Sequence, residues 1–364
     1  GAHPKAPSLV VRHNEEIPLD RLIEMYPLEL LGNRVYKNYG PKLPFLFKVL
    51  SIAEPLSIQS HPDKKQAERL HEEDPENYPD ANHKPEIAVA LNRLSALMGF
   101  RPVPEILGMM EQYKSLQQLA GRSTVETLEN SSGRTEEERK ASLKMLFAEM
   151  MRRAAGDPAL FKSIIEDILS ELQKVRKEWG KREKLFVYCN EIYPYDIGLI
   201  SVLLLNLSEL KAGQGVYIGA GIPHAYLEGE IVECMANSDN VVRAGLTPKF
   251  KDVKTLTEIL TYESGSAEII NGGYNTGLYT YQTPAPEFEI SRWETGERAE
   301  RIEFKSDGPQ IILIHTGRMT LHWDSGSGNH IMEIRKGQSV FIPAILGDLK
   351  ITSNGEGRLF RVRV

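Results

Sequence analysis

The strongest constraint on the fold is a short pattern that occurs twice in the sequence. The first copy, KAGQGVYIGAGIPHA, begins at Lys211, and the second, RKGQSVFIPAILGDL, begins at Arg335. The two copies align without gaps, with these residues at equivalent positions: Gly213 and Gly337, Gln214 and Gln338, Val216 and Val340, Ile218 and Ile342, and Ala220 and Ala344. Each copy predicts a strand, a turn and a second strand. A repeated unit of this kind predicts two copies of one β-fold.

The pattern G-x-x-V-x-I-P-x-x-x-x-H resembles the second motif of the cupin family. In a cupin jelly roll this hairpin carries one metal-binding histidine. The position is His224 in the first copy and Asp348 in the second. We therefore expect a mainly β chain with two cupin-like jelly-roll barrels, a metal site in the first barrel and none in the second.

A helical unit is expected between the two barrels. The first hundred residues are rich in Pro and Gly with short β-type runs, and from Pro104 the apolar period changes to that of a helix. Thr135 followed by Glu138 is a capping-box pattern, and Asp157-Pro158 marks a second helix start. The predicted domains are a catalytic barrel over 1–100 and 198–262, a helical insert over 101–197, and a metal-free barrel over 263–364.

Composition limits the possible partners and the compartment. The net charge is −6 with Lys and Arg dispersed along the chain, which argues against a nucleic-acid-binding protein. The longest apolar stretch, 197–205, is too short to cross a bilayer, so no membrane is expected. Two cysteines, Cys189 and Cys234, fit buried thiols in a reducing compartment, which predicts a cytoplasmic location.

Four residues form a candidate metal site. Gln59 and His61 are two positions apart on a predicted strand, so both side chains face the inside of the barrel. Glu86 lies in a second segment and His224 in a third. Two imidazoles, a carboxylate and an amide oxygen suit Zn²⁺, and His61, Glu86 and His224 alone would satisfy the usual three-ligand rule of catalytic zinc.

Four blocks of sequence resemble the signature blocks of type I mannose-6-phosphate isomerases. They are LSIQSHPDK from Leu56, NHKPE from Asn82, GIPHAYLEG from Gly221 and ECMANSDNVVRAGLTPK from Glu233, in the order of that family. The resemblance implies one zinc ion held by Gln59, His61, Glu86 and His224. It also implies interconversion of mannose 6-phosphate and fructose 6-phosphate, and a chain that is commonly monomeric.

The same resemblance implies the other residues of the active site: Arg243 as the active-site arginine, with Ser57, His83, Lys84, Glu233, Asp239 and Lys249 in the pocket. Isomerisation moves a proton between C1 and C2 through an enediol(ate), so a base must collect and return it. Glu233 and Lys84 are both candidates, and the sequence does not choose between them. His83 and Asp239 could assist ring opening, and Arg243 could stabilise the enediolate. Ser57 and Lys249 could bind the phosphate.

Two other functions fit parts of this pattern. Two histidines and a carboxylate can also hold Fe(II), which would make the chain a metal-dependent cupin oxygenase. A cupin that binds a sugar phosphate without turnover is the second alternative. The chain also opens at GAHP (1–4), a motif that family members carry well inside the protein, so we expect one or more strands of the first barrel to be missing.

Overall fold

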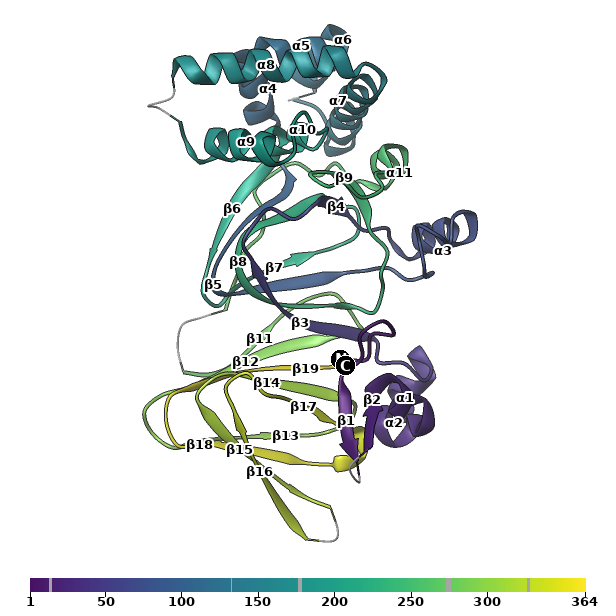
Figure 1. The fold of residues 1–364 in the computed structure, drawn as a ribbon, viewed down its shortest axis with the longest axis vertical. Coiled ribbons are helices and arrows are strands. Elements are labelled where there is room, and N and C mark those ends of the chain that lie inside the picture. Colours follow the sequence, from purple (N-terminus) through teal and green to yellow (C-terminus); the bar gives the residue numbers. More distant parts are fainter. Residues whose placement is uncertain (13–14, 132, 176–178, 273–275, 326–327) are drawn as a thin grey trace.

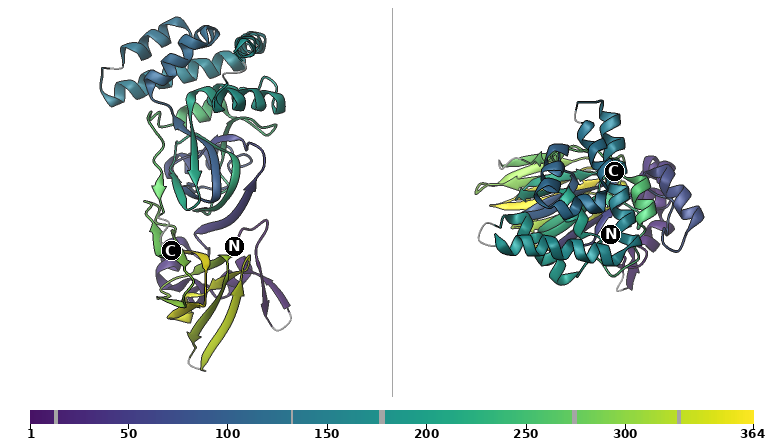
Figure 2. Two further views of the ribbon diagram at one scale, coloured as in Figure 1. Left: turned by 90° about the vertical axis from the view of Figure 1, so that its left-hand side faces the viewer. Right: turned by 90° about the horizontal axis from the view of Figure 1, so that it is seen from above.

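The structure is a computed structural model that describes residues 1–12, 15–131, 133–175, 179–272, 276–325 and 328–364. The molecule is elongated, with a helical segment at one end, a first barrel in the middle and a second barrel at the other end (Figures 1 and 2). This arrangement is the expected fold class, two cupin-like barrels with a helical insert.

Long apolar runs build the centre of the first barrel. Its strands are β3 (Phe45–Ile52), β4 (Ile58–Ser60), β5 (Glu86–Phe100), β6 (Leu205–Lys211), β7 (Gln214–Ile218), β8 (His224–Ala236), β9 (Val242–Gly245) and β10 (Ile270–Asn271). They form an eight-stranded sheet in the order β10-β7-β5-β8-β4-β9, with β3 on β8 and β6 on β5. β5 and β8 are almost wholly buried, as expected of the central pair of a closed sheet. The strands expected over 44–52, 56–61 and 84–94 are therefore present.

The helical segment follows from its capping signals and apolar faces. Its helices are α4 (Val103–Gln112), α5 (Lys114–Ala120), α6 (Arg122–Asn130), α7 (Glu136–Gly156), α8 (Pro158–Lys174), α9 (Lys181–Ile192) and α10 (Leu199–Leu204). Thr135 and Glu138 make the predicted capping box on α7, and the Asp157 side chain caps α8. Because α10 is helical, the helices run beyond residue 197. None of the helices in the described ranges combines the length and apolarity needed to span a bilayer.

The second barrel is built from two antiparallel sheets. Its strands are β11 (Gly277–Tyr281), β12 (Glu289–Thr295), β13 (Glu300–Phe304), β14 (Gln310–Thr316), β15 (Arg318–Asp324), β16 (Asn329–Arg335), β17 (Ser339–Ile342), β18 (Leu349–Ser353) and β19 (Gly357–Arg363), with the short 3₁₀ helix η2 (Ala344–Leu346). The sheet β11-β12-β19-β14-β17 encloses an apolar core with the sheet β13-β18-β15-β16.

The two copies of the repeat have the same local structure. The first copy forms β7, a turn and the start of β8, and the second forms β17, η2 and the start of β18. Gly213 has φ 80° and the equivalent Gly337 has φ 81°. The side-chain oxygen of Gln214 accepts from the Lys211 amide at 2.8 Å, and that of Gln338 accepts from the Arg335 amide at 2.9 Å. The prediction of two copies of one β-unit is confirmed down to these hydrogen bonds.

The first hundred residues contain helices as well as strands. β1 (Leu9–Arg12) and β2 (Glu15–Pro18) form a hairpin, followed by α1 (Leu19–Met25), α2 (Pro27–Tyr39) and later α3 (Lys64–Glu73), and α11 (Val253–Ile259) follows β9. Leu31 and Val35 on α2 share an apolar cluster with Ile311 and Phe360 of the second barrel. Figure 1 shows α1 and α2 beside that barrel. The short β-type runs expected in this region are present, and the helices over 19–39, where the apolar residues recur at helical spacing, were not expected from the sequence.

Candidate metal centre

Three strands bring the predicted ligands to one point inside the first barrel. Gln59 lies on β4, His61 directly after it, Glu86 at the start of β5 and His224 at the start of β8. Gln59 and His224 are cross-strand partners, so their side chains share one face. Along the β5–β8 pair, His224 is opposite Met98, whereas Glu86 lies at the other end of β5. Glu86 and His224 can therefore meet only because the sheet closes into a barrel.

The distances between these side chains suit a shared cation. His61 Nε2 lies 3.3 Å from Glu86 Oε2, and His224 Nε2 lies 3.0 Å from Glu86 Oε1. The amide nitrogen of Gln59 lies 3.3 Å from His224 Nε2. Within the described residues, ligand atoms of His61, Glu86 and His224 all lie within 4.8 Å of one another, and these three side chains are fully buried. The group can therefore hold one metal ion.

Backbone carbonyls fix the orientation of both imidazole rings. His61 Nδ1 lies 3.0 Å from the carbonyl oxygen of Asn240, and His224 Nδ1 lies 3.0 Å from that of Ile222. Because a carbonyl oxygen can only accept, each Nδ1 carries the proton and donates it. Both Nε2 atoms then present lone pairs to the site. Hydrogen bonds of this kind set the tautomer of metal-binding histidines.

At the centre, His61 Nε2 and Glu86 Oε2 are buried polar atoms with no hydrogen-bond partner among the residues that the structure describes. A buried polar group without a partner costs about 1–3 kcal/mol, more if it is charged, so such atoms are rare unless a ligand satisfies them. Burial and then Lys84 lower the pKa of His61 to about 4, which keeps the imidazole neutral near pH 7. Burial opposes ionisation of Glu86, but the positive charge of Lys84 favours the carboxylate, and the pKa of Glu86 lies well below its ordinary value. A neutral imidazole facing an ionised carboxylate is the donor set that a divalent ion requires.

Charged groups surround this cluster on the barrel interior. Lys84 is buried, and its Nζ lies 3.6 Å from Glu86 Oε2. Glu233 is also buried, and burial together with the charge of Glu86 raises its pKa. The hydroxyl of Tyr226 donates to Glu86 Oε1 at 3.3 Å. On β3, Nζ of Lys48 lies 3.9 Å from Oε2 of Glu233.

Three residues of this site, Lys48, Tyr226 and Asn240, were not predicted from the sequence. Lys48 is a lone cation within the apolar strand FLFKVL, and this feature of the sequence could have identified it as a candidate site residue. Tyr226 follows two residues after His224 on the same strand, so alternation places both on one face. Asn240 acts through its backbone, and a side-chain pattern carries no signal for such a role.

His83 and Asp239 are held by contacts on the rim of the barrel. His83 Nε2 lies 2.6 Å from Glu287 Oε1, and Glu287 is in the connection between β11 and β12 of the second barrel. Asp239 contacts His3 Nε2 at 3.0 Å and Lys5 Nζ at 3.2 Å. Asp239 and Glu287 line one pocket of about 490 Å³. The two predicted ring-opening residues therefore lie beside a cavity formed with the N-terminal segment.

The remaining predicted residues follow β4 and β9. Arg243 on β9 is the cross-strand partner of Gln59 on β4, so its half-buried side chain points to the same face as Gln59. Ser57 is half-buried just before β4. Lys249 is exposed in the loop after β9. The roles of these residues stay predictions.

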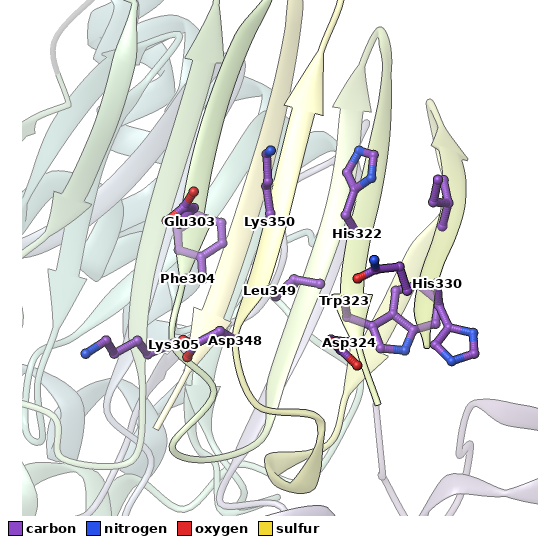
Figure 3. A pocket seen from close by; sticks show the side chains of 12 residues that line it. Glu303, Phe304, Lys305, His322, Trp323, Asp324, His330, Asp348, Leu349 and Lys350 are labelled. Atoms are coloured by element: carbon purple, nitrogen blue, oxygen red, sulfur yellow. The ribbon is translucent and has the colours of Figure 1, made fainter. Parts of the chain in front are cut away.

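Asp348, the equivalent of His224 in the second copy, has a different setting. It is exposed and lines a pocket of about 560 Å³ on the second barrel with Glu303, His322 and Lys350 (Figure 3). Lys350 is the cross-strand partner of both Glu303 and His322. In Figure 3, the Glu303, Lys350 and His322 side chains lie side by side across neighbouring strands, and Asp348 lies below them in the view. This row differs from the convergent cluster in the first barrel.

A jelly-roll barrel with a buried His–Glu–His cluster defines the class of metal-dependent cupins. A family model, phosphomannose isomerase type I, catalytic domain, matches residues 1–103. Mannose-6-phosphate isomerase 2 of Arabidopsis thaliana is 37% identical over 335 residues, covering 92% of this chain and 74% of that protein. Mannose-6-phosphate isomerase of Schizosaccharomyces pombe is 36% identical and covers 94% of this chain and 84% of that protein.

Solved structures agree with this relationship. A mutant of phosphomannose isomerase from Salmonella typhimurium has a TM-score of 0.85 at 29% identity, covering all of this chain and 89% of that chain. A mannose 6-phosphate isomerase bound with zinc and yttrium has a TM-score of 0.84 at 29% identity, with the same coverage. This chain belongs to the type I mannose-6-phosphate isomerase family.

Proposed function

We propose that this chain is a zinc-dependent aldose–ketose isomerase that interconverts mannose 6-phosphate and fructose 6-phosphate. The observation that carries the proposal is the buried cluster of His61, Glu86 and His224, whose two Nε2 atoms and one carboxylate face a common point. Gln59 would be a further, weaker ligand through its amide oxygen. A bound zinc ion supplies a Lewis acid that polarises a substrate oxygen.

The residues around the cluster can move the proton between C1 and C2. Lys84 and Glu233 are the two buried groups among the predicted residues that can collect and return it, and both interact electrostatically with Glu86. The raised pKa of Glu233 brings its carboxyl group nearer to the range of a general base at neutral pH. Separate Glu233→Gln and Lys84→Met variants distinguish the two, because loss of the true base abolishes proton exchange at C2.

The other predicted residues would bind and open the sugar. Arg243 shares the face of Gln59, which suits a guanidinium that stabilises the charge of the enediolate. Ser57 and Lys249 would contact the phosphate, and His83 and Asp239 would transfer protons in ring opening. The cations Lys48, Lys84 and Arg243 on this side of the barrel favour an anionic substrate over the oxygenase alternative.

We also propose a cytoplasmic, monomeric protein. Cys189 and Cys234 are free and buried, which fits a reducing compartment. Burial also raises the pKa of the Cys189 thiol to about 12, so it stays protonated and unreactive. The monomeric state rests on the resemblance to the family.

A metal-loaded assay tests the proposed function. The chain is stripped with a chelator, reloaded with one equivalent of zinc and supplied with mannose 6-phosphate. We expect fructose 6-phosphate to form only after reloading. His224→Ala should abolish turnover and lower bound zinc, because it removes one of the three closest ligand side chains. Turnover in metal-free buffer would contradict the metal role, oxygen uptake without isomerisation would favour the oxygenase, and binding without turnover would favour the non-catalytic cupin.

A further inference from the structure

The loop between α9 and α10 of the helical segment packs closely against the end of β9. Gly198 precedes α10, Gly245 ends β9, and their backbones approach closely. A Cβ atom on Gly198 would lie 2.7 Å from the backbone nitrogen of Leu246, and a Cβ atom on Gly245 would overlap the backbone of Gly198. Only glycine allows two chain segments to meet this closely.

A single carboxylate, that of Asp196, closes this junction. Asp196 Oδ1 accepts from the Gly198 amide at 2.8 Å and from the Leu246 amide at 2.7 Å. Asp196 Oδ2 accepts from Lys251 Nζ at 2.8 Å. The Asp196 side chain is only 9% exposed. One side chain of the helical segment therefore binds the first residue after β9 and a lysine further along the same loop.

The residue that Asp196 holds has an unfavourable backbone. Leu246 has φ 52°, in the left-handed region that non-glycine residues rarely adopt, and its side chain is fully buried. Such a conformation persists only where surrounding contacts impose it. The hydrogen bond from the Leu246 amide to Asp196, together with burial of the side chain, fixes the direction in which the chain leaves β9.

Two predicted substrate contacts lie on either side of Leu246. Arg243 is on β9 opposite Gln59, and Lys249 is in the loop that follows, where its amide donates to the Thr247 hydroxyl at 3.2 Å. We propose that Asp196 is a positioning residue for Arg243 and Lys249, through which the helical segment sets the geometry of the substrate pocket. This inference rests on the proposed isomerase function.

Three substitutions separate the contacts of Asp196. Asp196→Ala removes the acceptor of both amides, whereas Asp196→Asn retains one oxygen for them and gives up the charge and the acceptor of Lys251 Nζ. Lys251→Ala removes the partner on the solvent side alone and leaves both amide hydrogen bonds to Asp196 Oδ1 intact. Gly198→Ala keeps the aspartate but adds a Cβ that would lie 2.7 Å from the Leu246 nitrogen and 3.0 Å from Asp196 Oδ1, so it pushes β9 away from the 196–198 segment. This variant gives an independent test if Asp196→Ala folds poorly.

We expect Asp196→Ala and Gly198→Ala to lower kcat/KM on the order of 10- to 100-fold, the effect of a misplaced catalytic group. Zinc content should remain one per chain, because no ligand is touched. Asp196→Asn and Lys251→Ala should stay close to the wild type. Amide hydrogen exchange should accelerate in 242–249 of the first two variants, while β5 and β8 stay protected.

The outcomes distinguish this inference from the proposed function. If the zinc-loaded wild type does not isomerise mannose 6-phosphate, the proposed function fails, and the local exchange rates still test the anchoring of β9. If the wild type is active and Asp196→Ala matches it in kcat/KM and in exchange at 242–249, the positioning role is wrong. Exchange that rises throughout the barrel with loss of zinc would reduce Asp196 to a general stabilising residue and also overturn the proposal.

Discussion

Asp80, which contacts none of the ligand side chains, should control zinc affinity. Its carboxylate accepts from the Ser238 hydroxyl and from the Asp239 amide, each at 2.8 Å, and it also contacts the Asn240 side chain. These bonds hold the loop whose Asn240 carbonyl orients the His61 ring. Asp80→Ala should therefore release that carbonyl and leave Nε2 of His61 less well directed at the metal.

The expected loss of zinc affinity follows from the hydrogen bonds that Asp80→Ala removes and from their indirect effect on the His61 ring. Each hydrogen bond to a charged group contributes about 1.5–3 kcal/mol, so removing three of them loosens the loop, while Asn240 Nδ2 keeps its bonds to the backbone carbonyls of residue 80 and Asn82. Loss of a group that orients a ligand typically lowers metal affinity about 10- to 100-fold. That range corresponds to about 1.4–2.8 kcal/mol. We expect Asp80→Ala to fall within it, and Asp80→Asn, which keeps one acceptor oxygen, to have a smaller effect.

A competition titration measures the effect directly. Zinc-loaded wild type and variants are titrated with a chelator of known affinity, and the zinc dissociation constants are compared. Asp63→Ala is the matched control, since Asp63 caps α3 through Gln66 and does not contact the 238–240 loop. A dissociation constant for Asp80→Ala equal to that of wild type and of Asp63→Ala would refute the reasoning.

Three further perturbations test other parts of the account. Asp348→Ala should leave the zinc content of the purified protein unchanged, because Asp348 is exposed on the second barrel, and a lower content by metal analysis would contradict this. Arg243→Ala should lower mostly kcat if the guanidinium acts on the transition state, whereas steady-state kinetics showing only a higher KM would assign it to uniform binding. Leu31→Ala, at a fully buried site, should destabilise the packing of α2 on the second barrel by about 2–5 kcal/mol in urea unfolding, with bound zinc unchanged. An unaltered midpoint would mean that α2 does not pack there.

The features that could be predicted from the sequence are those with local signals. The repeat placed β7 and β17 at equivalent points because glycine, glutamine and alternating apolar residues determine a turn and a strand locally. Thr135 and Asp157 marked the starts of α7 and α8 because caps act within one helical turn. The convergence of Gln59, His61, Glu86 and His224 could be expected because the cupin-like hairpin and strand alternation together place them on the barrel interior.

Features that depend on contacts between distant segments could not be predicted in this way. The packing of α2 on the second barrel joins Val35 to Phe360, and neither residue carries a signal for the other. The same holds for the His83–Glu287 contact and for the junction between Asp196 and Leu246. The domain bounds and the individual roles of the site residues stay predictions.

The most direct test of the central claim is an anomalous-scattering map from a crystal of the zinc-loaded chain, recorded at the zinc absorption edge. We expect one strong peak within about 2.0–2.2 Å of Nε2 of His61, Nε2 of His224 and a carboxylate oxygen of Glu86. A zinc peak elsewhere in the molecule, with these three side chains left without metal, would contradict the account.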